Sequence, residues 1–453
     1  MSLTAPRVGT APGALPVLGH AWELRTRPLE FLAALPAHGD LVEIRLGPSP
    51  GYVVCAPELL RHVLADSRTF DKGGPFFDKA RALFGDSLAM ARWAQHRWQR
   101  RQLQPAFQTA RIAGYAEVMG EEVARMTRSW RAGSTVGLVD ALNALALRIV
   151  TRSVLAAAAE DRAVAEFQRS LPPAVEGLYR RTLTPVPLLH SLPTPGNLRY
   201  FRARRRIRRA TDDVIRAQRA APPDDGGLVS LLLSARHGEH DGPLSDADIR
   251  DQLIVMIGAG SDTTANALAF AYWLLAGHPA AEERLHQELD DVLKGRPARF
   301  DDLDSLPYTR SVVSETLRLY PPGWFFTRAT TAETELAGRR LPSGTTVLYS
   351  PYILHRHPGL FPEPERFDPD RWLPERADGT PRGALVPFGG GSRKCIGEQF
   401  ALTEMALALA GISARWALRP ARGTRLTPRA LGTLSPGPLS MVPRPRKEAP
   451  GHG

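Results

Sequence analysis

One short loop constrains this chain of 453 residues more than any other stretch. Residues 388–397 read FGGGSRKCIG, and Cys395 in this loop is one of only two cysteines in the sequence. Most free cysteines are buried and behave as small hydrophobic residues. Here the glycines let backbone N–H groups approach the sulfur, and a helix predicted to begin just after Cys395 favours the thiolate form. The loop therefore indicates a ligand-binding site.

Three kinds of site could use such a cysteine. A zinc site needs three or four ligands, and no other Cys or His lies within ligand spacing of Cys395. A cysteine nucleophile needs a histidine base, which the fold could bring from elsewhere in the chain. A large, flat, iron-bearing ligand with one axial thiolate needs no further residue, and Arg393 could pair with an anionic group on it. The loop favours this third site and leaves a cysteine hydrolase open.

The pattern of apolar residues predicts a mainly α fold with a minor β part. Residues 41–56, LVEIRLGPSPGYVVCA, predict two strands joined by a turn, and further short strands are expected around residues 325–350. Helical spacing dominates from about residue 80 to about residue 280. No linker or repeat divides the sequence, so we expect a single large domain over residues 1–453, with its core at about 10–445.

A long apolar helix is predicted to start after Ser245, whose side chain can cap it, and to end near Gly277. Its length suits a membrane span, but Asp262 would fall at its centre, where a carboxylate is costly in lipid. A buried helix in a protein without a membrane anchor is therefore expected. The N-terminus shows no signal-peptide pattern, and two distant cysteines indicate a reducing, cytoplasmic setting.

The net charge of +11 comes mainly from arginine, as in RYFRARRRIRR at residues 199–209. Such a run can indicate nucleic-acid binding, but no finger, helix-turn-helix or RNA-binding signature accompanies it. We therefore expect no nucleic-acid partner. A basic surface of this kind could instead bind an acidic protein.

The spacing Phe-x-x-Gly-x-Arg-x-Cys-x-Gly at residues 388–397 resembles the haem-binding loop of the cytochrome P-450 family, the haem-thiolate monooxygenases. In that family the cysteine thiolate ligates the haem iron and favours cleavage of the O–O bond. The resemblance implies a triangular, mostly helical cytochrome P-450 fold with buried haem b. It places the iron on Cys395 and the haem against Phe388, Gly389, Arg393 and Gly397.

The segment AGSDTT, residues 259–264, lies midway along the long predicted helix. On its own, a threonine there could simply bond back to the carbonyl one turn earlier and bend the helix. The family resemblance implies more: Thr263 hydrogen-bonds the bound dioxygen, and Asp262 relays protons to it. Ala259 and Gly260 would leave room for the oxygen.

Glu315 and Arg318, in SETLRLYPP, share one helix face at a spacing of three residues. Taken alone they would be an ordinary exposed ion pair. The resemblance implies instead a structural triad completed by an arginine from a later segment, and PERF at residues 364–367 offers Arg366. This triad is expected to support the cysteine loop rather than to take part in catalysis.

Four cationic or imidazole side chains match positions that bind the haem propionates in the family. They are His96 and Arg100 in QHRWQRRQLQPAF, Arg328 in FFTRATT, and Arg393. Each could instead be a surface residue, which is the usual place for an arginine. Lys394 has no such role and is a candidate for partner docking.

The segments that form the family's substrate pocket are apolar in this chain. We expect the pocket to be lined by Phe76, Phe77, Leu83, Trp324, Phe325 and Phe326. Wider stretches such as YRRTLTPVPLLHSLPTPGN are similar to bacterial cytochromes P-450 that oxidise cyclic sesquiterpenes. The implied reaction is hydroxylation of an unactivated carbon of a substrate such as pentalenene, in successive rounds to alcohol and aldehyde. Another terpenoid, a fatty acid, a macrolide or a steroid is the alternative substrate.

The resemblance also implies the redox partners. Electrons would pass from NAD(P)H through a ferredoxin reductase and a ferredoxin to haem, O2 would be the oxidant, and the enzyme would be a monomer that serves terpenoid or antibiotic biosynthesis. Two other functions fit the haem loop. A peroxide-using hydroxylase is disfavoured because such enzymes lack the Asp262–Thr263 pair, and a non-catalytic haem ligand-binding protein would need neither electrons nor Thr263.

Overall fold

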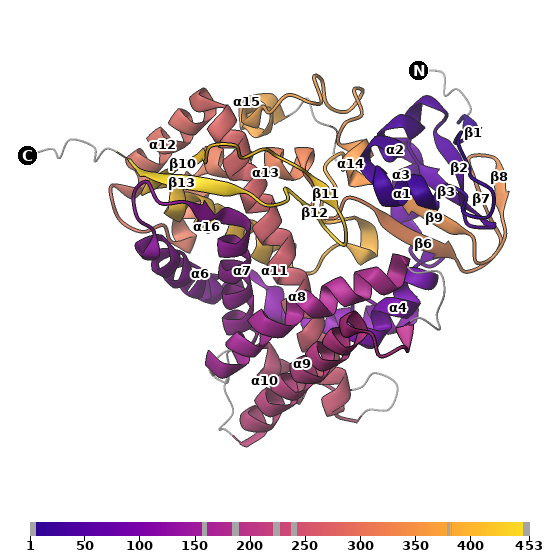
Figure 1. Ribbon diagram of the computed structural model, residues 1–453, viewed down its shortest axis with the longest axis horizontal. Helices are drawn as coiled ribbons and strands as arrows, with labels where there is room; N and C mark the ends of the chain where they lie inside the picture. The colour runs from indigo at the N-terminus through magenta and orange to yellow at the C-terminus, as the bar shows by residue number, and fades with distance from the viewer. Residues whose placement is uncertain are drawn as a thin grey trace, which may run out of the picture.

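The computed structural model describes residues 6–155, 161–183, 190–220, 227–236, 242–377, 381 and 383–446. Helices dominate the chain, as the sequence predicts (Figure 1). They are α1 (Ala21–Thr26), α2 (Pro28–Ala34), α3 (Pro57–Ala65), α4 (Pro75–Phe84), α5 (Trp93–Leu103), α6 (Thr109–Ser129), α7 (Leu138–Leu155), α8 (Asp161–Leu183), α9 (Pro195–Ala220), α10 (Leu228–Ser234), α11 (Asp246–Gly277), α12 (Pro279–Leu293), α13 (Pro307–Leu319), α14 (Pro351–Leu354), α15 (Pro374–Ala377) and α16 (Glu398–Ser413).

The strands form a minor part of the fold. They are β1 (Val8–Thr10), β2 (Leu41–Leu46), β3 (Ser49–Val54), β4 (Phe70–Asp71), β5 (Val136–Gly137), β6 (Phe326–Thr330), β7 (Thr334–Leu336), β8 (Arg339–Leu341), β9 (Thr346–Tyr349), β10 (Trp416–Pro420), β11 (Arg429–Ala430), β12 (Leu434–Ser435) and β13 (Ser440–Pro445).

Six strands make the largest sheet, in the order β1-β2-β3-β9-β6-β4. It gathers with α1 to α3 at one side of the molecule, while the long helices and the smaller sheet with β10 and β13 occupy the rest (Figure 1). The predicted hairpin at residues 41–56 is present: β2 and β3 pair antiparallel from Leu41 opposite Val54 to Leu46 opposite Ser49. The sheet thus joins the N-terminal segment to the strands that precede the cysteine loop.

Helix α11 runs through the middle of the helical part (Figure 1). It begins as predicted, because the Ser245 hydroxyl accepts from the Asp248 N–H and the Asp248 carboxylate accepts from the Ser245 N–H. At 32 residues it spans roughly 48 Å. Its length and composition would allow a membrane crossing, but 72% of its most apolar window is buried inside the protein. It is therefore a core helix.

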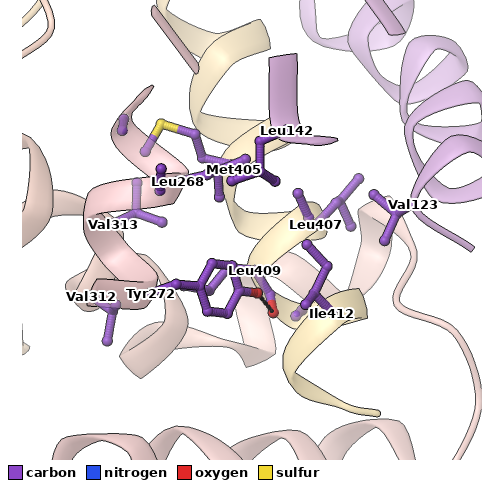
Figure 2. Close-up of a cluster of buried hydrophobic side chains, with 14 of the residues drawn as sticks. Val123, Leu142, Leu268, Tyr272, Val312, Val313, Met405, Leu407, Leu409 and Ile412 are labelled. Atoms are coloured by element: carbon purple, nitrogen blue, oxygen red, sulfur yellow. Dashed lines mark hydrogen bonds between the residues drawn. The ribbon is translucent and has the colours of Figure 1, made fainter. Parts of the chain in front are cut away.

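The main hydrophobic core forms where α11 meets α6, α7, α13 and α16. Figure 2 shows this cluster, in which Leu268 and Tyr272 of α11 pack among apolar side chains of the other four helices. The Tyr272 hydroxyl lies 3.3 Å from the Leu409 carbonyl oxygen, so its polar atom is satisfied inside the core. This packing fixes α16, which follows the cysteine loop directly, against α11, which carries the AGSDTT segment.

Candidate active site

A cavity of about 410 Å³ lies between α11 and the loop that carries Cys395. Its lining includes Cys395 together with Ala259, Gly260 and Thr263 of α11. Most of the remaining lining is apolar, and α7, α16 and the segment before β6 are among the elements that supply it. The fold therefore brings the two most informative motifs of the sequence to one internal space.

The Cys395 thiol faces this cavity from the segment just before α16. The loop is closed by a 2.9 Å bond from the Cys395 N–H to the Phe388 carbonyl, and Gly389 turns the chain with φ of 70°, a conformation that favours glycine. Burial raises the pKa of the thiol, while the Gly397 N–H and the positive charge of Arg100 act in the opposite direction. The Gly397 N–H and the Arg100 charge offset only part of this shift, and a bound metal cation would stabilise the anionic sulfur further.

A buried group of basic side chains borders the same space. Burial, together with the charges of Arg328 and Arg393, lowers the pKa of Lys72 to about 7. Burial and the charges of Arg393 and Lys72 lower the pKa of His96 to about 3, so its imidazole is neutral at physiological pH. Basic side chains that lower one another's pKa in this way indicate that the cluster needs a negatively charged partner.

The internal partners of Arg393 do not use all of its donors. Its guanidinium donates to the Asp71 carboxylate and, at 2.7 Å, to the Ala91 carbonyl. Its Nε is buried and has no hydrogen-bond partner in the described part of the chain, and burial lowers its pKa to about 10. Asp71 thus offsets one positive charge of the cluster, and two propionate carboxylates would suit the remaining ones. The thiol, the apolar walls and this cationic cluster together fit haem b.

The other predicted propionate-binding residues lie around this cluster. Arg100 on α5 donates to the main-chain carbonyl of Lys394. Arg328 is buried and donates to the Tyr349 hydroxyl at 3.3 Å. His96 is 3% exposed and does not line the cavity. Their roles toward haem remain predictions, and the structure places all of them near the thiolate loop.

In the AGSDTT segment, Thr263 lies at the cavity as predicted, and Gly260 has a packing role that the sequence did not predict. The Thr263 hydroxyl lines the cavity and donates to the Ala259 carbonyl at 2.8 Å. Gly260 also lines the cavity, but a Cβ there would come within 2.8 Å of Val150 on α7. The absence of a side chain at Gly260 therefore serves close packing of α11 on α7, besides any room that it leaves for oxygen.

Glu315 and Arg318 form a fully buried ion pair, not an exposed one. Their closest atoms lie 2.7 Å apart, and both side chains are 0% exposed. Arg318 also donates to three main-chain carbonyls, those of His355, Pro364 and Arg366, at 2.6–3.0 Å. The pair thus holds together α13 and the irregular segment that precedes the cysteine loop.

The predicted third member of this triad was wrong. The Arg366 side chain is exposed and pairs with Glu363, so only its main-chain carbonyl reaches Arg318. Arg371 takes the predicted place: its side chain is buried, with Nε 3.7 Å from a Glu315 carboxylate oxygen. The sequence held this signal, because PDRW at 369–372 repeats the Pro-acid-Arg-aromatic pattern of PERF five residues later. The second copy lies inward because its Trp372 indole also donates to Glu315, at 2.8 Å.

The predicted pocket residues on α4 do not line the cavity. Phe77 and Leu83 are buried in the apolar cluster where α4 packs against α8 and α11, and other members of this cluster, among them Val150 and Val154, line the cavity in their place. Phe76, one residue earlier on the helix, is 40% exposed. Because α4 buries one face against its neighbours, its side chains divide between core and solvent.

The segment 324–326 contributes one of its three aromatic residues to the cavity. Phe326 lines it, at the start of β6. Trp324 and Phe325 belong to the apolar cluster beside the large sheet, and the Trp324 indole donates to the Leu431 carbonyl at 2.9 Å. Among the residues that line the cavity instead are Ala89, Met256 and Leu317.

Three further residues of this region were not predicted from the sequence. Lys72 lines the cavity and donates to the Ala89 carbonyl at 2.8 Å. Thr433, in the turn between β11 and β12, lines the cavity and donates to the Asp262 carboxylate. Glu404 on α16 is 1% exposed, and neither of its carboxyl oxygens has a hydrogen-bond partner among the described residues. No motif marked them, since each comes close to the site only through the tertiary fold.

Glu404 predicts a measurable pH dependence of stability. Burial raises the pKa of this carboxyl well above its ordinary value, and the nearby Thr264 hydroxyl offsets only part of the shift. The folded protein therefore keeps a proton that the unfolded chain releases. The resulting stability is complete below the ordinary pKa of a glutamate and is lost as the pH rises through the raised value.

Glu404→Gln is expected to remove this loss, because glutamine keeps the shape and cannot ionise. Urea unfolding midpoints of both proteins from about pH 5 to about pH 9 test this, with the variant gaining on the native protein as the pH rises. Glu375→Gln, at an exposed position on α15, is the control. The same pH slope in Glu404→Gln and in the native protein would show that Glu404 does not bind this proton.

Comparisons with known proteins agree with this arrangement. A family model described as cytochrome P450 matches residues 10–441. The crystal structure of a cytochrome P450DA heme domain superposes with a TM-score of 0.88 at 26% sequence identity, and covers 98% of this chain and 99% of its own.

Several characterised relatives match nearly the whole chain. A cyclooctat-9-en-7-ol 5-monooxygenase of Streptomyces melanosporofaciens is 51% identical over 97% of this chain and 95% of its own length. A cyclooctatin synthase of the same organism is 49% identical, with coverage of 96% and 95%. A pentalenene oxygenase of Streptomyces avermitilis is 42% identical, with coverage of 94% of each chain.

These matches confirm the predicted fold class and the predicted class of enzyme, a monooxygenase. They also explain why Cys395, the AGSDTT segment and the buried Glu315–Arg318 pair occur together in one chain. The chain belongs to the cytochrome P450 family.

Proposed function

We propose that the chain is a terpenoid monooxygenase that holds haem b through Cys395. The reaction inserts one atom of O2 into an unactivated C–H bond, while the other atom leaves as water at the cost of two electrons and two protons. The observation that carries this proposal is that Cys395 and Thr263 line the same cavity. When bound there, haem supplies the iron that activates dioxygen.

The substrate class rests on the relatives and on the cavity. Two relatives at about half identity are named for cyclooctat-9-en-7-ol and cyclooctatin, and a third for pentalenene. The apolar side chains of Met256, Leu317 and Phe326 suit a hydrocarbon skeleton, which would bind by burial at about 25 cal/mol per Å². We therefore propose a cyclic terpenoid, either a sesquiterpene such as pentalenene or a skeleton like that of the cyclooctatin relatives, oxidised in one or more rounds to alcohol and aldehyde.

Asp262 and Thr263 supply the protons in this proposal. Burial raises the pKa of Asp262, and the Thr433 and Asn266 side chains offset part of that shift. A carboxyl of this kind can hold and release a proton closer to neutral pH than an exposed aspartate. The Thr263 hydroxyl uses its hydrogen on Ala259, so its oxygen can accept a hydrogen bond within the cavity.

Thr263→Ala is expected to lower product formation roughly 100-fold while NADPH consumption continues, because electrons then leave as hydrogen peroxide. Asp262→Asn is expected to act in the same direction. Product and peroxide measured per NADPH check both. Ser261→Ala, a neighbour on α11 that does not line the cavity, is the control. Undiminished product in Thr263→Ala would remove it from proton delivery.

Electrons are proposed to come from NAD(P)H through a ferredoxin. Arg97 and Arg101 are exposed on α5, and Arg100 between them contacts the main chain of Lys394 in the cysteine loop. Lys394 itself pairs with Glu398 at 2.5 Å and stays partly exposed. This basic face beside the thiolate suits an acidic protein. We further propose a monomer of one domain over residues 1–453 that works in the cytoplasm.

The test is turnover with ferredoxin, reductase and NADPH on a panel of apolar compounds. The panel contains pentalenene, cyclooctat-9-en-7-ol, a fatty acid, a macrolide and a steroid. A terpenoid that gains one oxygen atom per turnover supports the proposal. Oxidation of the other compounds only would reject the substrate class, peroxide-driven turnover without electrons would indicate a peroxide-using hydroxylase, and haem binding without turnover would indicate a binding protein.

A further inference from the structure

We propose that Thr433 is a positioning residue that holds the Asp262 carboxyl group for proton delivery into the cavity. Thr433 lies in the turn of the small hairpin formed by β11 (Arg429–Ala430) and β12 (Leu434–Ser435). This inference rests on the proposed function, since protons are needed only if dioxygen is reduced there.

A short chain of hydrogen bonds links α11 to this hairpin. The Thr433 hydroxyl donates to one carboxylate oxygen of Asp262. The Asn266 side chain, one turn further along α11 and 1% exposed, donates to the Thr433 oxygen at 3.2 Å. Because Asn266 occupies the Thr433 oxygen as a donor, the hydrogen of the Thr433 hydroxyl points toward Asp262.

The hairpin is itself fixed on both sides of Thr433. The Leu434 N–H donates to the Pro322 carbonyl at 2.9 Å, and the Leu431 carbonyl accepts from the Trp324 indole at 2.9 Å. Trp324 is 4% exposed, so its indole is held by packing on all sides and its hydrogen bond is largely shielded from water. Its place in the sequence marked it as a pocket residue, and the structure gives it the task of holding the turn that carries Thr433.

The position of Thr433 explains how Asp262 can reach the cavity. Thr433 and Thr263 line the cavity, whereas Asp262 does not. The Thr433 hydroxyl therefore joins the Asp262 carboxyl, which lies behind the cavity lining, to a group on the lining itself. Thr263 already spends its hydrogen on Ala259, so the Thr433 hydroxyl is the one directed at the acid.

A hydroxyl partner also suits a proton donor better than a cation would. No ion pair involves Asp262 among the residues that the structure describes. A neighbouring Lys or Arg would stabilise the carboxylate and lower its pKa, so that the group would be ionised at neutral pH and would hold no proton to deliver. A neutral threonine fixes the rotamer of Asp262 without this charge.

The first test needs no turnover. Thermal unfolding of the ferric protein is measured for Thr433→Val, Asp262→Ala and the double variant. Each single change is expected to lower Tm by roughly 1–3 °C, and the double variant is expected to fall by clearly less than the sum of the two, because the Thr433–Asp262 bond is counted in both single changes while the Asn266–Thr433 bond is lost only with Thr433. Shifts that simply add would show that the two side chains do not interact.

The second test asks whether the bond serves proton delivery. Thr433→Val is expected to lower product per NADPH roughly tenfold and to raise peroxide, while Thr433→Ser, which keeps the hydroxyl, stays near the native ratio. Spectral titration of substrate binding controls for altered packing and is expected to agree between the two variants. Equal losses in both variants, or a native ratio in Thr433→Val, would overturn the inference. A native protein that oxidises no terpenoid would reject the proposed function instead, and the unfolding cycle would still decide whether Thr433 holds Asp262.

Discussion

Replacing Glu315 with alanine is expected to destabilise the protein by about 3–5 kcal/mol and to prevent stable retention of haem. The change leaves the Arg318 guanidinium at 0% exposure without its carboxylate, and an unpaired buried charge carries this cost. It also removes the acceptor of the Asp368 N–H and of the Trp372 indole. Urea unfolding and the haem-to-protein absorbance ratio measure both effects.

The two candidate arginines of the triad provide a matched comparison. Arg366→Gln is expected to shift the unfolding free energy by no more than about 0.5 kcal/mol, because its ion pair with Glu363 is exposed. Arg371→Gln is expected to cost about 1–3 kcal/mol, because its side chain is buried against Glu315. The reverse order of these two effects would restore the sequence-based assignment of Arg366.

Replacing Cys395 with serine is expected to abolish terpenoid oxidation, with a loss of at least about 1,000-fold, or roughly 4 kcal/mol in activation free energy. A serine hydroxyl is not ionised at neutral pH, so the electron-rich sulfur that favours O–O cleavage is gone. The reduced carbon monoxide complex reports the same change, since its Soret band should lose the red shift that thiolate ligation produces.

The second cysteine, Cys55, provides the matched control variant for this experiment. Cys55 lies at the end of the β2–β3 hairpin, where it is buried and does not line the cavity. Burial and the charge of Asp40 raise its pKa to about 12, so it stays a neutral thiol. Cys55→Ser should keep the native Soret band and native turnover. A native band in Cys395→Ser would show that another side chain ligates the iron.

Local signals in the sequence predicted the framework of the fold. The start of α11 could be predicted because Ser245 and Asp248 satisfy its first N–H groups through short-range bonds. The β2–β3 hairpin and α16 were predictable for the same reason, since periodicity and turn residues act within a few positions. The loop at 388–397 carried its chemistry in one continuous stretch, and this is why Cys395 could be singled out.

Residues defined by tertiary contacts could not be found in this way. Lys72 and Thr433 lie outside the cysteine loop in the sequence, and both line the cavity only because the tertiary fold brings their segments beside α11. Phe77 and Trp324 were expected in the pocket because they are apolar and close to pocket segments, yet packing of α4 and of the hairpin turned them elsewhere. Apolar character does not tell a core residue from a lining residue.

Turnover in isotopically labelled dioxygen tests most directly whether the chain is a terpenoid monooxygenase. The native protein, loaded with haem and supplied with ferredoxin, reductase, NADPH and a cyclic terpenoid, is predicted to place one labelled atom in the alcohol product and one in water. The terpenoid product should carry no label when the label is in the water instead. Product oxygen that comes from water, or a terpenoid that remains unchanged while haem is bound, would contradict the proposed function.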